Sequence, residues 1–211
     1  MDLTVLKPPA KTSGPMPKFV FEDVLRAFWL VGSKKLAGRK ELADSLDLGE
    51  GTMRSVSSFL QARGFLKKIQ GGCMLSEKGE RVFEKLKAQL ISARQMPPLY
   101  STLERPSFCL QCSISVDFSV PNSVEARDAA VKAGSEGLVS LVFKRKNFFF
   151  LGTRDSVVPK DAKAIVSTFN ALEKSVFLLS FARKPLDRER GAWAAFIALQ
   201  KNSRSRSVGG V

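Results

Sequence analysis

The fold of the N-terminal half is decided by residues 38–80, which read GRKELADSLDLGEGTMRSVSSFLQARGFLKKIQGGCMLSEKGE. This stretch predicts a short helix, a tight turn, a second helix, a hairpin and the start of a further helix. The first helix is expected over residues 39–46 and the second over residues 50–63. Between them lies Asp47-Leu48-Gly49, where a glycine suits the sharp reversal that two consecutive helices need.

Both helices have one apolar stripe, and the second also has a distinctive polar face. The inward stripe of residues 50–63 consists of Met53, Val56, Phe59 and Leu60. The other face carries Thr52, Arg54, Ser55, Ser58 and Gln61. Short hydroxyls beside an arginine and a glutamine suit close contact with base edges and phosphates. The alternative is that the serines only solvate an exposed face, but serine is a poor helix former, which favours a contact role.

A hairpin follows the second helix. Residues 65–69 and 73–75 are predicted strands, and Gln70-Gly71-Gly72 is the turn between them. Lys67 and Lys68 lie on the first strand, where such a hairpin would touch a phosphate backbone. Ser76 is a good N-cap for the next helix, whose apolar positions predict that it continues to about Ala93.

The residues before this stretch supply its support. Prolines and polar residues in positions 1–17 predict a flexible arm. Phe21, Val24, Leu25, Phe28 and Trp29 then mark one face of a helix over residues 21–31, which Gly32 and Ser33 are expected to end.

Four segments in this order, LADSL, GTMRSV, LQARGFL and LSEKGE, resemble the winged helix-turn-helix domains of bacterial and archaeal transcription regulators. The resemblance covers about residues 18–93. The full layout also resembles an uncharacterised archaeal family with an N-terminal winged helix and a C-terminal domain of unknown role. The resemblance implies that Thr52, Arg54, Ser55 and Ser58 occupy the recognition helix and that Lys67 and Lys68 occupy the wing. The predicted DNA-contacting residues are Arg39, Lys40, Thr52, Arg54, Ser55, Ser58, Lys67 and Lys68.

The C-terminal half alternates between strands and helices after a predicted linker over residues 94–106. Its expected elements are strand 108–120, helix 123–133, strands 137–144 and 147–151, helix 161–172, strand 175–181 and helix 185–199. The predicted class is therefore α+β, with a winged helix-turn-helix followed by a βαββαβ, ferredoxin-like domain over residues 107–200 that ends in an extra helix. Residues 201–211 are expected to form a disordered basic tail.

Composition narrows the possible chemistry. The chain has 34 Lys and Arg against 20 Asp and Glu, a net charge of +14, which favours a polyanionic partner. The excess is shared equally, because residues 1–96 and 97–211 each carry seventeen basic and ten acidic side chains. The sequence contains no histidine, which excludes Ser-His-Asp and Cys-His catalysis and histidine metal sites. Cys109 and Cys112 form a C-x-x-C, but they lie in a predicted strand, so they are interpreted as core cysteines rather than a redox or metal pair.

These features predict a cytoplasmic DNA-binding transcription regulator rather than an enzyme, without cofactor, metal or membrane span. Its partners would be double-stranded DNA, a second copy of the chain and a small-molecule effector, the last two through the C-terminal domain. The alternative is a winged-helix module that binds protein or RNA without recognising a DNA sequence. An enzyme with its active site in the C-terminal half is the least favoured reading, since its carboxylates form no catalytic grouping.

Overall fold

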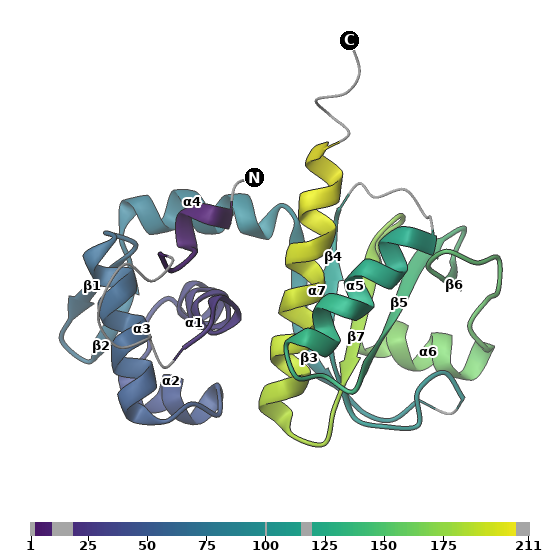
Figure 1. Cartoon of the computed structure of the whole chain (residues 1–211), viewed down its shortest axis with the longest axis horizontal. Helices are drawn as coiled ribbons and strands as arrows, with labels where there is room; N and C mark the ends of the chain where they lie inside the picture. Colours follow the sequence, from purple (N-terminus) through teal and green to yellow (C-terminus); the bar gives the residue numbers. More distant parts are fainter. Residues whose placement is uncertain (1–2, 10–18, 100, 115–119, 206–211) are drawn as a thin grey trace, which may run out of the picture. The chain divides into compact units, whose positions relative to one another are not determined.

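The computed structural model describes residues 3–9, 19–99, 101–114 and 120–205. The chain divides into two compact units, Met1–Lys87 and Ala88–Val211 (Figure 1). The boundary therefore lies before the predicted linker over residues 94–106. Residues 88–93, which the sequence predicts to complete the last N-terminal helix, belong to the second unit. Among the described residues, no helix has both the length and the apolar composition needed to cross a membrane.

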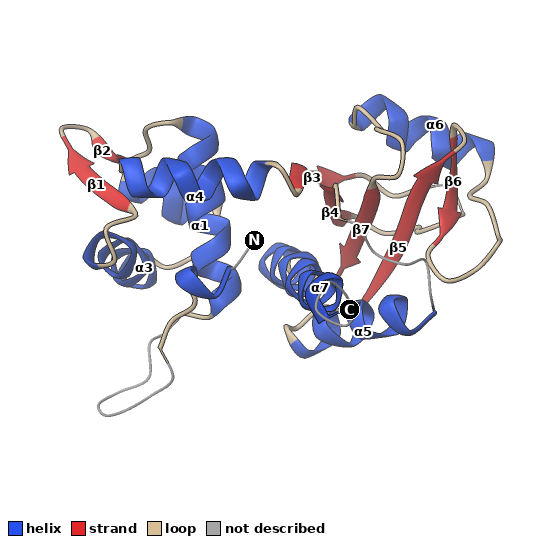
Figure 2. Cartoon of the chain, turned by 90° about the horizontal axis from the view of Figure 1, so that it is seen from above, coloured by secondary structure: helices blue, strands red, loops and turns tan. Residues whose placement is uncertain are grey.

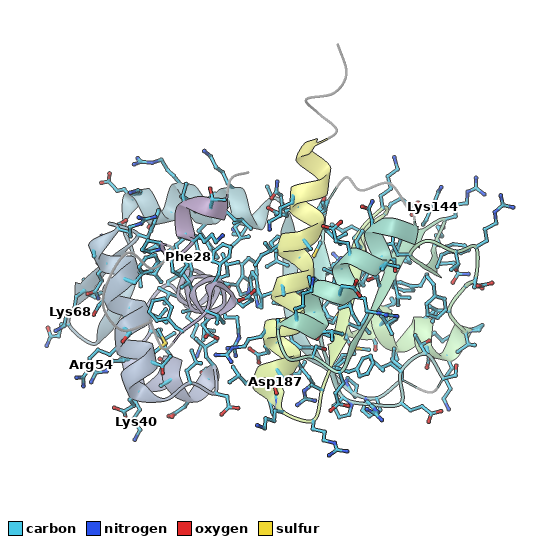
Figure 3. The ribbon with its side chains drawn as sticks, in the orientation of Figure 1. Phe28, Lys40, Arg54, Lys68, Lys144 and Asp187 are labelled. Atoms are coloured by element: carbon cyan, nitrogen blue, oxygen red, sulfur yellow. The ribbon has the colours of Figure 1, made fainter. Side chains whose placement is uncertain are left out.

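The N-terminal unit has the predicted order of helices and hairpin. Its elements are η1 (Leu3–Leu6), α1 (Phe21–Lys34), α2 (Arg39–Ser45), α3 (Glu50–Ala62), β1 (Leu66–Ile69), β2 (Gly72–Leu75) and α4 (Glu77–Lys87). Phe28 of α1, labelled in Figure 3, lies in the N-terminal unit. It is fully buried and makes edge-on ring contacts with Phe65 and Phe83. Helix α1 therefore provides the aromatic surface against which the start of the hairpin and α4 pack.

A buried ion pair fixes α1 to the end of α2. Arg26 Nη1 donates to Asp23 Oδ1 at 3.1 Å, and Arg26 Nη2 donates to the Leu46 carbonyl at 2.6 Å. Asp23 and Arg26 are 0% and 2% exposed. A buried charge is tolerated only when it is paired and hydrogen-bonded. The Asp23–Arg26 pair and its hydrogen bond to Leu46 therefore hold the end of α2, and the turn that follows it, against α1.

Three local predictions in this unit are wrong. Helix α1 runs through Gly32 and Ser33; Gly32 is needed for close packing, since a Cβ there would lie 2.4 Å from the Phe83 ring. In the turn after α2, Asp47 takes the left-handed conformation, with a φ of 52°. Gly49 does not, since its φ is −59°. Within the predicted flexible arm, residues 3–6 form a 3-10 helix whose Leu3 and Leu6 are buried. Residues 10–18 lie outside the described residues.

Helix α4 ends at Lys87, well before the predicted end at Ala93. Its cap is as predicted, since Ser76 Oγ accepts a hydrogen bond from the Gly79 amide at 3.0 Å. Residues 90–96, expected to be helix and linker, instead form strand β3 (Leu90–Met96), which pairs with β4 (Ser107–Cys112). The linker over residues 94–106 is thus wrong in its first part, because the sheet recruits these residues as an edge strand.

The C-terminal unit is a five-stranded antiparallel sheet in the order β3-β4-β7-β5-β6. Its other elements are α5 (Val120–Lys132), β5 (Gly137–Lys144), β6 (Asn147–Phe150), α6 (Pro159–Thr168), β7 (Val176–Phe181) and α7 (Pro185–Ser205). Helix α6 covers one face of the sheet, and α5 and α7 cover the other (Figure 2). Sheet and helices form a three-layer arrangement of mixed α/β class.

The predicted order of elements is present, but the ferredoxin-like topology is not confirmed. The sheet has a fifth strand, and its helices lie on both faces, whereas a ferredoxin-like domain carries its helices on one face. Strand β4 ends at Cys112, so the predicted strand over residues 108–120 is too long; residues 115–119 lie outside the described residues. Helix α7 continues to Ser205, so the first part of the predicted disordered tail is helical.

Candidate nucleic-acid interface

A concave site of about 220 Å³ lies between helix α3 and the β1–β2 hairpin. Its lining residues come from α2, α3 and the hairpin: Arg39, Arg54, Ser57, Ser58, Gln61, Lys68, Gly72 and Cys73. We call this site the recognition groove. Three cations from three different elements therefore converge on a surface that also offers hydroxyl and amide groups.

The hairpin is held against the start of α2 by backbone hydrogen bonds. The Ala37 amide donates to the Cys73 carbonyl at 3.1 Å, and the Cys73 amide donates to the Ala37 carbonyl at 3.0 Å. Gly72 makes this approach possible, because a Cβ there would lie 2.3 Å from the Ala37 oxygen. The hairpin is thus held in a fixed position beside α2 and α3.

One face of α3 forms the wall of the groove. Ser57, Ser58 and Gln61 follow Arg54 by three, four and seven positions, so the four residues share one face of the helix. Ser57 is only 8% exposed, and its hydroxyl makes no hydrogen bond within the described residues. Because its oxygen is itself shielded from solvent, Ser57 forms part of the wall of the groove and not one of its exposed polar groups.

Four of the eight predicted contact residues line the groove: Arg39, Arg54, Ser58 and Lys68. Lys40, Arg54 and Lys68 lie along one edge of the N-terminal unit (Figure 3). Thr52 precedes Arg54 by two positions, about 200° around the helix, and does not line the groove. Ser55 also lies outside the lining, and its hydroxyl donates to the Gly51 carbonyl at 3.1 Å.

The two hairpin lysines differ in position. Lys67 and Lys68 are consecutive on β1, opposite Met74 and Cys73 of β2. Consecutive side chains of a strand point to opposite faces, so Lys68 lines the groove and Lys67 does not. Both are exposed. The hairpin therefore presents one lysine to the groove and the other to its outer face.

The five cations of the predicted contact set are not engaged by acidic side chains. Within the described residues, Arg39, Lys40, Arg54, Lys67 and Lys68 take part in no ion pair. The nearby carboxylate of Glu41 is instead occupied by Lys34 and by the Gly38 amide. The Lys34 hydrogen bond, followed by that of Gly38, lowers the pKa of Glu41. This acid is therefore engaged by its own neighbours, and the two cations of α2 have no ion-pair partner in the part of the chain that the structure describes.

Sequence reasoning left several groove residues out of the predicted contact set: Ser57, Gln61, Gly72 and Cys73. Gln61 was placed on the polar face of the helix but not among the contacts. Helical spacing from Arg54 would have selected Ser57 and Gln61 and removed Thr52. Gly72 and Cys73 carried no signal in the sequence, because their place in the groove depends on the pairing of the hairpin with Ala37.

Cys109 and Cys112 of β4 are both fully buried and free, as the sequence predicted. Cys109 belongs to the core beneath α6, together with Ile165 and Phe169. Burial raises the pKa of both thiols well above the usual value. Thiols with raised pKa values are poor nucleophiles and poor metal ligands. Among the described residues, no three His, Cys, Asp or Glu side chains group as a metal site.

Two family models match the chain, one in each half. Residues 24–90 match the family model of the CggR N-terminal DNA binding domain. The match to a DNA-binding family thus falls on the unit that carries the groove. Residues 110–199 match a family described as a domain of unknown function (DUF4443).

One solved structure resembles nearly the whole chain. It is a hypothetical protein, PH0730, from Pyrococcus horikoshii OT3, with a TM-score of 0.70 and 22% sequence identity over 90% of this chain and 98% of that chain. At this identity the likeness shows the fold alone. The comparison with curated proteins finds no match.

Proposed function

We propose that this protein is a DNA-binding transcription regulator that inserts α3 into the major groove and lays the β1–β2 hairpin on the backbone. The observation that carries the proposal is the recognition groove, where Arg39, Arg54 and Lys68 converge from three elements. The match of residues 24–90 to a DNA-binding family supports it independently.

The groups in the groove suit two kinds of contact. Arginine binds guanine edges through two parallel hydrogen bonds, and glutamine binds adenine in the same way, so Arg54 and Gln61 are the candidates for base contacts. Arg39 and Lys68 line the groove from α2 and the hairpin, and Lys40 follows Arg39 on α2. These three cations would bind phosphates, which positions the protein without specifying sequence.

For the C-terminal unit we propose a binding role, in dimerisation or in sensing a small molecule, and no catalytic role. A dimer would place two α3 helices on a two-fold symmetric site, as paired half-sites require.

The proposal is tested by fluorescence anisotropy of the full chain with genomic fragments and with random-sequence duplexes. We expect a preferred fragment that binds at least about a thousandfold more tightly than random DNA. If the three cations assigned to phosphates each contact one, the logarithm of the association constant should fall with the logarithm of the salt concentration with a slope of about −3. Binding without preference would overturn sequence-specific recognition, and no binding, with capture of a protein or RNA instead, would favour an interaction module.

Lys68→Ala should weaken binding to every duplex by about threefold to tenfold and reduce the salt slope by about one. Lys67→Ala should have a clearly smaller effect, because only Lys68 lines the recognition groove. The two variants are matched controls, since each removes one lysine from the same strand. Anisotropy at three salt concentrations separates them. Equal losses would contradict the placement of the groove on one side of the hairpin.

A further inference from the structure

A second concave site lies wholly within the C-terminal unit, at the β5–β6 hairpin. It has a volume of about 350 Å³ and is lined by Val142, Lys144, Arg145, Phe149, Thr153 and Arg154. We call it the hairpin site; Figure 3 shows Lys144 at its position on the unit. The recognition groove shares no lining residue with it.

The floor of the hairpin site is set by strand register. Val142 of β5 is the direct partner of Phe149 of β6, so the two side chains are neighbours on one face of the sheet. Lys144 lies two residues beyond Val142 and therefore on the same face. Val142 is buried and Phe149 is half-buried. An aliphatic group and an aromatic ring thus form an apolar floor with a lysine at its end.

The rim is formed by two turns that the backbone holds in place. Arg145 and Lys146 adopt positive φ angles of 52° and 60°, and the Arg145 amide donates to Glu173 Oε1 at 2.8 Å. On the other side, the loop after β6 folds back, with the Phe150 amide bonded to the Asp155 carbonyl at 3.0 Å. Arg145 and Arg154 are therefore presented by two anchored turns.

Thr153 offers a directed donor in the same loop. Its Oγ1 accepts a hydrogen bond from the Asp155 amide at 3.1 Å. A hydroxyl has one hydrogen to donate, and this contact uses only an acceptor lone pair, so the hydrogen stays available to a ligand. Three cations and one hydroxyl donor therefore surround a ring and an aliphatic group, which is the donor set for an anion attached to a flat, apolar body.

We propose that the hairpin site binds a small anion in which a phosphate group is joined to a planar ring, as in a nucleoside monophosphate. Arg145, Arg154 and Thr153 would bind the phosphate, and the ring would lie on Phe149 and Val142. The volume of about 350 Å³ lies at the lower end of ligand pockets. This inference rests on the sensing role proposed for the C-terminal unit and names the chemistry that would be sensed.

Isothermal titration calorimetry of the full chain with adenosine 5′-monophosphate tests the site. We expect saturable, submillimolar binding, with adenosine and inorganic phosphate each at least about tenfold weaker, since each lacks one half of the recognised group. Arg154→Ala and Arg145→Ala should each weaken binding by about tenfold, the effect of one lost charge-assisted contact. Arg183→Ala removes an arginine that is 96% exposed in the same unit and outside the site, and should change nothing.

Two results would overturn the hairpin site: no binding of adenosine 5′-monophosphate beyond that of adenosine, or equal binding by the wild type and Arg154→Ala. Anisotropy with DNA on the same samples keeps the two proposals apart. Nucleotide binding without DNA binding would uphold the site and reject the regulator. A loss of DNA affinity in Arg154→Ala without nucleotide binding would show that this surface contacts nucleic acid, and would reject the nucleotide site.

Discussion

Gly79→Ala is expected to lower the unfolding free energy of the N-terminal unit by about 3 kcal/mol, at the upper end of the cost of overpacking. A Cβ at this position would lie 2.1 Å from the Phe65 carbonyl oxygen and 3.3 Å from the Leu75 Cβ. That oxygen cannot move freely, because it accepts a hydrogen bond from the Ser76 amide at 3.0 Å. Since Gly79 is in the first turn of α4, the clash would push the helix away from the hairpin.

Thermal unfolding of the full chain measures this effect. The two tryptophans, Trp29 and Trp193, lie one in each unit, so Trp29 fluorescence in a Trp193→Phe background reports on the N-terminal unit. For a unit of this size the transition should fall by on the order of 15 °C.

Gly51→Ala is the matched control for this substitution. Its Cβ would meet nothing within 4 Å, and it lies within α3, so alanine should raise stability by up to about 1 kcal/mol. An unchanged transition in Gly79→Ala, or a fall of similar size in Gly51→Ala, would contradict the packing described here.

The N-terminal motif could be predicted from sequence because its signals are local. The apolar stripes of α2 and α3, the glycine-rich hairpin turn and the Ser76 cap each involve neighbours within a few positions. The packing roles of Gly32 and Gly79 could not be predicted in this way. They depend on close contacts with Phe83 and Phe65, which lie in other parts of the fold. A glycine that permits a close approach cannot be distinguished from one that ends a helix by its neighbours alone.

Strand β3 was missed because its sequence continues the helical pattern of α4. Leu90 follows Leu86 by four positions and is buried, but it is buried in the other unit. As an edge strand, β3 is partly exposed and lacks a clear alternation. Only its partner β4 decides its conformation, and a pairing between strands separated by a long loop leaves no local signal.

The burial of the central strands explains the three-layer arrangement. All six residues of β4 are buried, and five of the six in β7. A strand without alternation is buried on both faces, so helices must cover both sides of the sheet. A ferredoxin-like domain carries its helices on one face, and the order of elements alone does not distinguish that arrangement from helices on both faces. In the recognition groove, likewise, helical spacing was available to separate Thr52 from Arg54, while the contributions of Gly72 and Cys73 required the folded hairpin.

Arg54→Ala should reduce discrimination between a preferred and a random duplex by about tenfold to a hundredfold, the cost of one lost bidentate base contact. Arg54 is the long cationic side chain on the groove-facing side of α3, and within the described residues it takes part in no ion pair. Affinity for random DNA should fall much less, because only the phosphate contacts of the other cations contribute to it. Competition anisotropy with both duplexes measures the ratio.

Two further variants separate base recognition from charge. Arg54→Lys keeps the charge but loses the planar pair of donors, so it should retain non-specific affinity and still lose most of the discrimination. Arg81→Ala removes one arginine from α4, outside the recognition groove, and should leave the ratio of affinities unchanged. If Arg54→Ala and Arg54→Lys both left discrimination unchanged, Arg54 would act as a phosphate contact. The choice of sequence would then rest with Gln61 and the serines of α3, whose shorter side chains require the helix to lie deeper in the major groove.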